Sequence, residues 1–298
     1  MIKKYTELTK KLPGVKADVL LAGHTTFKIG GPADLFYEAN TTDKIIQAVK
    51  LARRLKIPYF ILGEGSNLLI SDQGFKGLVI KIQTSEFKLR NSNIIADGGV
   101  KLKTLVEETA KVGLFGLEFV AGIPGTLGGA VRGNAGAWQQ NIGDRVLKVR
   151  VLTEKGEIKW LNQKNCQFKY RQSRFKKTSE IILEVELQLG KGVRKEISKK
   201  IKKILKKREI QPKELSAGCI FINPKPLSAG KLIEGCGLKG RRIGDAQISP
   251  QHANFIVNLG QARAKDVLQL IKLAKTKVQK KFGVRLEKEI YLLGFDKI

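Results

Sequence analysis

Two glycine-rich segments of the chain contain the residue types that can bind phosphate groups. The longer spans residues 119–137 (FVAGIPGTLGGAVRGNAGA) and the shorter spans residues 62–68 (LGEGSNL). Because glycine has no Cβ, such a segment can aim several backbone N–H groups at one point and let a ligand approach the main chain. Two of them in one chain favour a single large phosphate-bearing ligand held at two places. The alternative for residues 119–137 is a tightly packed helix whose glycines admit a neighbouring strand.

The common nucleotide-binding motifs are absent from these segments. No G-x-x-x-x-G-K-[ST] pattern occurs in the chain, which excludes a P-loop. After Gly63 and Gly65, Leu68 stands where a Rossmann fingerprint requires glycine. The segment also lacks a strand–loop–helix unit followed by an acidic residue about twenty positions later. A phosphate site built from these glycines therefore belongs to another fold.

Helix-period and strand-period segments alternate along the chain and indicate an α+β fold. Lys155–Gly156 separates two apolar runs and predicts a hairpin. Thr42 is expected to cap the first helix, and a change of composition at residues 190–192 predicts the main domain boundary. The expected helices are 43–56, 102–112, 194–209, 228–235 and 264–282, and the expected strands are 59–62, 78–82, 93–96, 146–153, 158–161, 181–189, 217–224, 253–258 and 288–293.

The composition is that of a globular protein with a strong positive charge. The 298 residues carry a formal net charge of +29, which favours anionic partners such as nucleic acid, membrane surfaces or phosphate-bearing small molecules. The most basic segment, residues 193–210, reads as a surface helix, with nucleic-acid or membrane contact as the alternative. No aromatic residue interleaves with it, so a stacking platform for bases is absent. Its expected buried stripe consists of Ile197, Ile201, Ile204 and Leu205.

Cysteine and histidine usage narrows the class of protein further. Cys166, Cys219 and Cys236 are widely spaced and form no C-x-x-C pair, which argues against a disulfide framework or structural zinc and for a reducing cytoplasm. With only two histidines, no metal site is expected. The basic, polar start of the chain predicts no signal peptide, and no apolar run has the length to span a bilayer.

A set of short motifs between about residue 24 and residue 291 resembles the UDP-N-acetylenolpyruvoylglucosamine reductase family. As a set they are far more specific than any single glycine loop. The chain has no obvious insertion after Tyr170 and Arg171, so it resembles the shorter subtype of the family. The motifs are TFKIGGPAD at 26–34, LGEGSNLL at 62–69, GLEF at 116–119, GIPGT at 122–126, NAG at 134–136, FKYRQS at 168–173, SAGCIFINP at 216–224, KLIE at 231–234, GLKG at 237–240, HANF at 252–255 and LEKE at 286–289.

The resemblance implies an FAD enzyme of the vanillyl-alcohol-oxidase-type fold. It implies FAD-binding lobes at residues 1–80 and 81–192, and a C-terminal α+β substrate-binding domain at residues 193–298 whose final strand returns to the active site. Such an enzyme uses NADPH to reduce the enolpyruvyl ether of UDP-N-acetylglucosamine to UDP-N-acetylmuramate, an early cytoplasmic step of peptidoglycan synthesis. Non-covalent FAD is expected to contact Gly63, Gly65, Ser66, Asn67, Leu68, Gly122, Ile123, Gly125, Thr126, Gly128, Gly129, Asn134, Ala135 and Gly136.

The same resemblance sets expectations about partners. The partners are a UDP-sugar substrate and NADPH, without nucleic acid and without membrane insertion, and the protein is a monomer or weak oligomer. A flavin oxidase or dehydrogenase on the same FAD fold is the alternative enzyme, and a basic nucleic-acid-binding protein is the alternative without catalysis. Oxidases of this fold often attach flavin through His or Cys, and the glycine-rich segments contain neither.

Reducing a carbon–carbon double bond conjugated to a carboxylate requires a hydride at one carbon, a stabilised enolate-like intermediate and a proton at the other carbon. The motifs place Arg171 as the group that stabilises the growing negative charge, because a guanidinium offers a charge-assisted fork to a carboxylate. They place Glu289 as an acid that polarises the same end of the substrate. The alternatives are a surface ion pair for Arg171 and the polar face of the final strand for Glu289.

Cys219 occupies the position where the family usually has a serine that donates the proton. A thiol can donate a proton, and its reference pKa of about 8.5 makes it more acidic than a hydroxyl. We therefore expect Cys219 to be the general acid, with a small buried apolar residue as the alternative. Tyr170 is expected to bind a substrate phosphate or carboxylate, or else to be a core aromatic. Asn223 is expected to orient the substrate or the adjoining turn.

Overall fold

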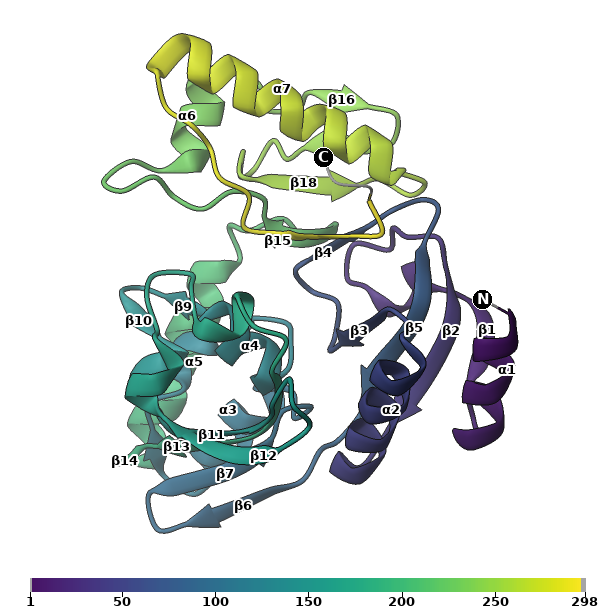
Figure 1. Ribbon diagram of the computed structural model, residues 1–298. Helices are drawn as coiled ribbons and strands as arrows, with labels where there is room; N and C mark the ends of the chain where they lie inside the picture. Colours follow the sequence, from purple (N-terminus) through teal and green to yellow (C-terminus); the bar gives the residue numbers. More distant parts are fainter. Residues whose placement is uncertain (1, 296–298) are drawn as a thin grey trace. The chain divides into compact units, whose positions relative to one another are not determined.

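The structure, a computed structural model, describes residues 2–295, and they form two compact units (Figure 1). Unit 1 contains the N-terminal segment up to Val15, residues 37–63 and residues 80–208. Unit 2 contains residues 16–36, residues 64–79 and the chain from Glu209 onward. The boundary after Arg208 lies beyond the one expected at residues 190–192, so the basic helix belongs to unit 1. The expected lobes at 1–80, 81–192 and 193–298 remain a prediction.

The elements of unit 1 alternate between short strands and helices, and most of the longer ones match the periodic segments of the sequence. They are α1 (Ile2–Lys11), α2 (Thr42–Leu55), β3 (Tyr59–Leu62), β6 (Phe87–Arg90), β7 (Asn93–Asp97), α3 (Leu102–Lys111), β8 (Leu114–Phe115), η2 (Glu118–Val120), α4 (Leu127–Gly133), β9 (Gly136–Ala137), β10 (Gln140–Asn141), η3 (Ile142–Asp144), β11 (Val146–Leu152), β12 (Ile158–Asn162), η4 (Gln163–Cys166), η5 (Arg174–Lys176), β13 (Ile181–Gln188), β14 (Gly190–Lys191) and α5 (Arg194–Arg208).

An antiparallel sheet of order β12-β11-β13-β7-β6 organises unit 1. Val149, Val151 and Val185 alternate with more exposed residues and are fully buried, as expected for strands with one face on a core. Helix α4 packs on β7 and β13, and Val131 of this helix belongs to the same core. The β11–β12 hairpin confirms the turn predicted at Lys155–Gly156.

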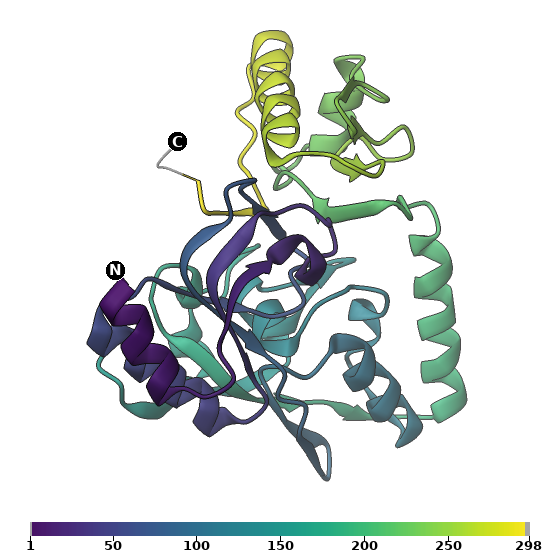
Figure 2. The same ribbon diagram turned by 90° about the vertical axis from the view of Figure 1, so that its right-hand side faces the viewer.

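The basic segment forms α5, which lies beside α3 (Figure 2). Ile197 and Ile204 are buried, whereas Leu205 is 44% exposed, so the expected apolar stripe was wrong at that position. Lys200 Nζ lies 3.0 Å from Oε1 of the buried Glu118. The cap of α2 was also wrong by one residue, because Thr41 and not Thr42 accepts the N–H of Lys44 through its hydroxyl.

Unit 2 combines small sheets with two helices. Its elements are β1 (Lys16–Leu20), η1 (Leu21–His24), β4 (Leu68–Ile70), β15 (Leu215–Cys219), α6 (Ala229–Gly235), β16 (Arg242–Ile243), β17 (Ala246–Ile248), β18 (Phe255–Asn258), α7 (Ala264–Phe282) and β19 (Tyr291–Leu293). Strands β2 (Pro32–Ala39) and β5 (Phe75–Ile82) begin in unit 2 and end in unit 1. Together with β1 and β3 they form the sheet of order β1-β2-β5-β3.

The core of unit 2 lies between α7 and the sheet of order β15-β18-β17-β16. Leu270 and Val267 of α7 are fully buried in it. Asp72 accepts hydrogen bonds from the N–H groups of Ala264 (2.8 Å) and Lys265 (3.2 Å), so a carboxylate from the segment after β4 satisfies free donors in the first turn of α7. Strand β4 pairs in parallel with β19, Leu68 opposite Tyr291. In residues 2–295 no helix is both long and apolar enough to cross a membrane.

Candidate active site

The two glycine-rich segments meet inside unit 1. A Cβ added to Gly63 would lie 2.8 Å from Thr126 Oγ1, so only glycine admits this approach. Thr126 is buried, and its hydroxyl accepts the N–H of Gly129 as the N-cap of α4. Lys81 Nζ donates to the carbonyl of Gly63 and fixes the other side of the shorter segment. Residues about sixty positions apart in the sequence thus form one surface.

The longer segment is a loop followed by a short helix, so both interpretations of it hold in part. The N–H of Gly128 donates to Gly98 O (2.7 Å), and a Cβ at Gly128 would lie 2.9 Å from that oxygen. This is the close helix–chain approach of the packing alternative. At Gly129 a Cβ would meet only Thr126 Oγ1, at 3.4 Å, and at Gly133 it would meet nothing within 4 Å. These two positions leave bare main chain, which fits a large ligand such as FAD.

The rest of the shorter segment lies in unit 2 beside the end of the chain. Gly65 has φ +65°, and a Cβ there would lie 2.5 Å from His24 O. Asn67 Nδ2 donates to Glu289 O (3.2 Å), and Tyr291 N–H donates to Asn67 O (3.0 Å). The expected cofactor residue Asn67 and the expected catalytic residue Glu289 are therefore neighbours.

Cys219 and Glu289 are also brought together in unit 2. Cys219 ends β15 opposite Phe255, and the next carbonyl, Ile220 O, accepts the N–H of Glu289 at 2.8 Å. A bridge between Phe221 and Lys288 continues this antiparallel contact. Cys219 is half-buried, and Glu289 precedes the final strand instead of lying within it.

A buried asparagine that the sequence reasoning missed holds the chain next to Cys219. Asn254 Oδ1 accepts the N–H of Phe221 (2.9 Å), and Asn254 Nδ2 donates to Phe221 O (2.8 Å). Its own carbonyl accepts the N–H of Ile220 (2.8 Å). The available signal was a polar residue inside the apolar run at 253–257. Buried amides in such runs need partners, and here the partner is the main chain of Phe221, two residues after the end of β15.

Tyr170 and Arg171 form the tip of a tight hairpin in unit 1. Lys169 and Gln172 exchange two N–H···O bonds of 3.0 Å, and Arg171 adopts φ +55°. Tyr170 is 37% exposed, which excludes the core alternative. The Arg171 guanidinium carbon lies 5.8 Å from the centre of the Tyr170 ring. Lys176 Nζ donates to Arg171 O (2.9 Å) and ties the tip to η5.

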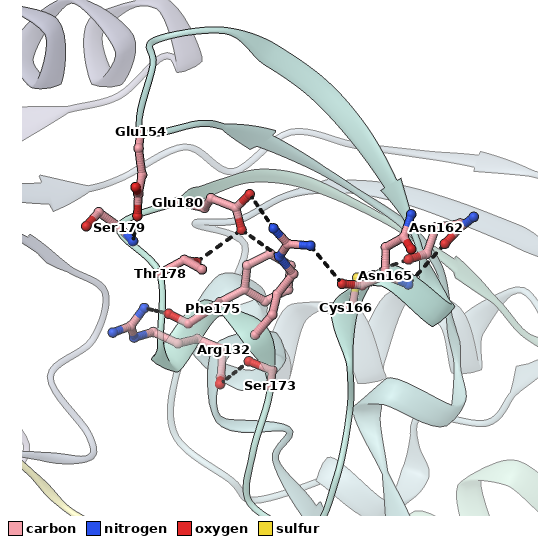
Figure 3. A network of polar contacts seen from close by, with 11 residues as sticks. Arg132, Glu154, Asn162, Asn165, Cys166, Ser173, Phe175, Thr178, Ser179 and Glu180 are labelled. Carbon is pink, nitrogen blue, oxygen red and sulfur yellow. Dashed lines mark hydrogen bonds and ion pairs between the residues drawn. The ribbon is translucent and has the colours of Figure 1, made fainter.

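A polar network supports the chain that follows this hairpin (Figure 3). Ser173 Oγ donates to Arg132 O (2.6 Å), and Arg132 donates to Phe175 O. Arg174 makes a two-pronged contact with the buried carboxylate of Glu180 (2.8 and 3.0 Å). Nearby Cys166 is fully buried, and desolvation raises the pKa of its thiol to about 11, so it stays protonated.

Two further predicted site residues, Asn223 and Ile123, form hydrogen bonds within the protein. Asn223 is exposed, and its Oδ1 accepts the N–H of Ala229 (2.9 Å), which is a task in the adjoining turn. Among the expected cofactor contacts, Ile123 N–H donates to Val120 O (2.9 Å) and so serves the protein. Arg171 belongs to unit 1, whereas Cys219 and Glu289 belong to unit 2. The structure brings together the last two.

Comparisons with known proteins agree with these features. A family model described as an FAD binding domain matches residues 33–162, and one described as the UDP-N-acetylenolpyruvoylglucosamine reductase C-terminal domain matches residues 211–293. The reductase of that name from Alkaliphilus oremlandii is 42% identical, with 98% of each chain covered. The one from Anoxybacillus flavithermus is 43% identical, with 94% of each covered.

A solved structure extends the agreement to three dimensions. The crystal structure of the UDP-N-acetylenolpyruvylglucosamine reductase from Thermus caldophilus superposes with a TM-score of 0.82 at 39% identity, and covers 94% of this chain and 98% of its own. The α+β class and the order of an FAD-binding region followed by a C-terminal domain are confirmed. The chain therefore belongs to the UDP-N-acetylenolpyruvoylglucosamine reductase family.

Proposed function

We propose that this protein reduces the enolpyruvyl ether of UDP-N-acetylglucosamine to UDP-N-acetylmuramate, with FAD as cofactor and NADPH as the source of electrons. The observation that carries the proposal is the meeting of Cys219, Glu289 and Asn67 in unit 2. Two groups that can donate protons lie beside one of the two glycine loops. Family membership supports both the cofactor and the reaction class.

The chemistry that FAD would supply when bound is hydride transfer from NADPH to the double bond of the substrate. The residues that fit its binding are those at the meeting of the two glycine segments. Thr126 holds the longer loop against Gly63, and Gly129 exposes its main chain there. Ser66 and Asn67 follow in the shorter segment.

Arg171 is proposed to hold the substrate carboxylate. When hydride adds to the carbon β to that carboxylate, the electron pair of the double bond moves toward the carboxylate oxygens. A guanidinium at those oxygens stabilises the negative charge as it grows. Tyr170, at the same hairpin tip, is proposed to bind a neighbouring oxygen of the substrate. Tyr170 is exposed and Arg171 is half-buried, so both differ from core residues at this tip.

Cys219 is proposed to complete the reaction by donating its thiol proton to the carbon α to the carboxylate. The carbon–hydrogen bond forms as the electron pair returns from the carboxylate, and the sulfur is left as a thiolate that solvent reprotonates. Glu289, on the adjacent segment, is proposed to polarise the carboxylate end of the substrate in its protonated form. Asn223 is proposed to orient the substrate through the turn that it holds.

The test uses the purified full-length protein. We expect bound flavin, and we expect NADPH consumption that depends on the enolpyruvyl UDP-sugar and yields UDP-N-acetylmuramate. A protein without flavin contradicts the proposal. Oxidation of another substrate by oxygen, without reduction of the UDP-sugar, supports a flavin oxidase instead.

We further place the reaction in the cytoplasm. UDP-sugars and NADPH are cytoplasmic metabolites, and none of the three cysteines forms a disulfide, as in proteins of reducing compartments. A monomer or weak oligomer remains our prediction for the assembly. Sedimentation of the purified protein measures it directly.

A further inference from the structure

Asn134, one of the expected cofactor contacts, bonds other parts of the protein through both ends of its side-chain amide. It ends α4 in the left-handed region (φ +45°) and is 3% exposed. Its Nδ2 donates to Lys169 O (2.8 Å), and its Oδ1 accepts the N–H of Gly143 (3.0 Å). Its backbone N–H donates to Val131 O (3.2 Å). Each end of this buried amide therefore bonds another segment of the protein.

The contact of Asn134 with its partners is closely fitted. A Cβ added to Gly143 would lie 2.8 Å from Asn134 Oδ1 and 2.6 Å from Phe168 Cγ. Only glycine can therefore stand at residue 143 while Asn134 and Phe168 keep their places. Phe168 directly precedes Lys169, whose carbonyl is the acceptor for Asn134. The amide thus connects the end of α4, η3 and the start of the hairpin.

The main-chain pairing of the hairpin is short. Its only bridge in the described chain is Lys169 with Gln172, and it belongs to none of the named strands. The carbonyl held by Asn134 lies two residues before Arg171. After the tip, Lys176 Nζ donates to Arg171 O and Ser173 Oγ donates to Arg132 O. The direction of the Arg171 side chain depends on where these bonds place the tip.

We propose that Asn134 is a positioning residue that fixes the Tyr170–Arg171 tip for the substrate carboxylate. The proposal rests on the proposed function, because it takes the role of Arg171 from there. It assigns Asn134 to the reaction through Arg171 and not through contact with FAD. Displacing a catalytic group by about 1 Å costs on the order of a hundredfold in rate, so a side chain that sets this position has a large effect.

The test variant is Asn134→Gly, because glycine keeps the left-handed backbone and removes both side-chain bonds. The matched control is Asn91→Gly, which makes the same substitution at an exposed residue of unit 1 with φ +56°. In Asn134→Gly we expect kcat to fall about 10- to 100-fold. We expect the flavin content, and the rate at which NADPH bleaches the visible absorbance, to match the wild type. Only the return of that absorbance on adding the enolpyruvyl UDP-sugar should be slow.

A second measurement, hydrogen exchange, does not depend on catalysis. Hydrogen exchange at the amides of Lys169 and Gln172 in the holoenzyme should become faster in Asn134→Gly and stay unchanged in Asn91→Gly. A companion variant, Asn134→Asp, keeps the acceptor for Gly143 and removes the donor to Lys169, so it separates the two bonds if the glycine variant folds poorly. We expect Asn134→Asp to show the same slow step. In an Arg171→Gln background the added loss should be small, because both changes act on one group.

Two results would overturn the proposal. One is loss of FAD in Asn134→Gly or Asn134→Asp with a normal rate once FAD is resupplied, which identifies a cofactor contact. The other is unchanged hydrogen exchange in the hairpin. A wild-type protein that consumes no NADPH with the UDP-sugar defeats the proposed function instead, and the exchange experiment still reports on the hairpin.

Discussion

The chain segments that carry Arg171 and Cys219 are held in different ways. Arg171 stands at a two-residue tip supported by side chains, chiefly those of Asn134 and Lys176. Cys219 stands in a sheet strand, with Phe255 on one side and the segment of Glu289 bonded to the next residue. A tip held by side chains can lose its geometry through one substitution, whereas a strand held by main-chain bonds keeps its course. The position of Arg171 is therefore the more fragile of the two.

The largest effect is expected from Arg171 itself. Arg171→Gln removes the charge opposite the carboxylate and should lower kcat about 10²- to 10³-fold. Arg171→Lys keeps a charge without the two-pronged geometry and should recover part of the rate. Steady-state kinetics and flavin content measure both. Equal activity of the glutamine variant and the wild type would remove Arg171 from the mechanism.

The second effect tests whether the strand delivers a proton donor. Cys219→Ala should lower kcat on the order of 10²-fold, the usual contribution of a general acid. Cys219→Ser keeps a proton and should remain much more active. Cys236→Ala, at another half-buried cysteine of unit 2, is the control and should leave the rate unchanged. Near-normal turnover of Cys219→Ala would show that this thiol is not the proton donor and that Cys219 is a small apolar residue instead.

The third effect is on stability and tests the support of the Cys219 strand. Asn254→Ala leaves the N–H and C=O of the buried Phe221 without their side-chain partner, which should cost about 3 kcal/mol of unfolding free energy. Asn223→Ala removes one bond at an exposed amide and should cost about 1 kcal/mol. Denaturant titration compares the two. Similar losses would show that the buried amide contributes no more than a turn does.

The smallest effect is a pH dependence at His252, which lies two residues before Asn254 and accepts its N–H. Burial, with a smaller contribution from Lys239, lowers the pKa of His252 below its usual value of 6.5, and Glu234 opposes this. Its Nδ1 accepts the N–H of Asn254 (3.3 Å), a bond that protonation removes. The unfolded chain binds this proton more readily than the folded protein. The contribution of His252 to the free energy of unfolding should therefore be complete above pH 6.5 and decrease as the pH falls below that value. The unfolding temperature of His252→Gln should therefore fall less than that of the wild type as the pH decreases below 6.5. An equal fall in both proteins would contradict the assignment.

Local pattern was enough to predict the long periodic elements. Residues 264–282 and 59–62 have the bounds expected from their spacing, because each has one apolar face whose period is set by neighbours in the sequence. Helix α4 was offered only as an alternative, since Gly128, Gly129 and Gly133 give it a poor helix propensity. Its close approach to Gly98 depends on a residue thirty positions earlier, which local pattern does not reveal.

Two of the predicted site residues, Cys219 and Glu289, lie on neighbouring segments, and the roles of the predicted site residues stay predictions. The meeting of Cys219 and Glu289 followed from motif resemblance and not from spacing, because seventy residues separate them in the chain. Asn134 was expected at the cofactor on account of its place among glycines. Its hydrogen-bond partners are nine and thirty-five residues away, so local pattern could not predict these bonds.

The parallel pairing of β4 with β19 has a consequence for how the protein is made. Leu68 can pair with Tyr291 only after the ribosome has added the intervening residues, so β4 waits through most of synthesis without a partner on that side. Closing so long a loop is entropically costly and favours late assembly. Nascent chains that stop before residue 291 leave an apolar strand, Leu68 to Ile70, open to other strands. Early termination should therefore yield aggregation-prone fragments and not a smaller folded protein.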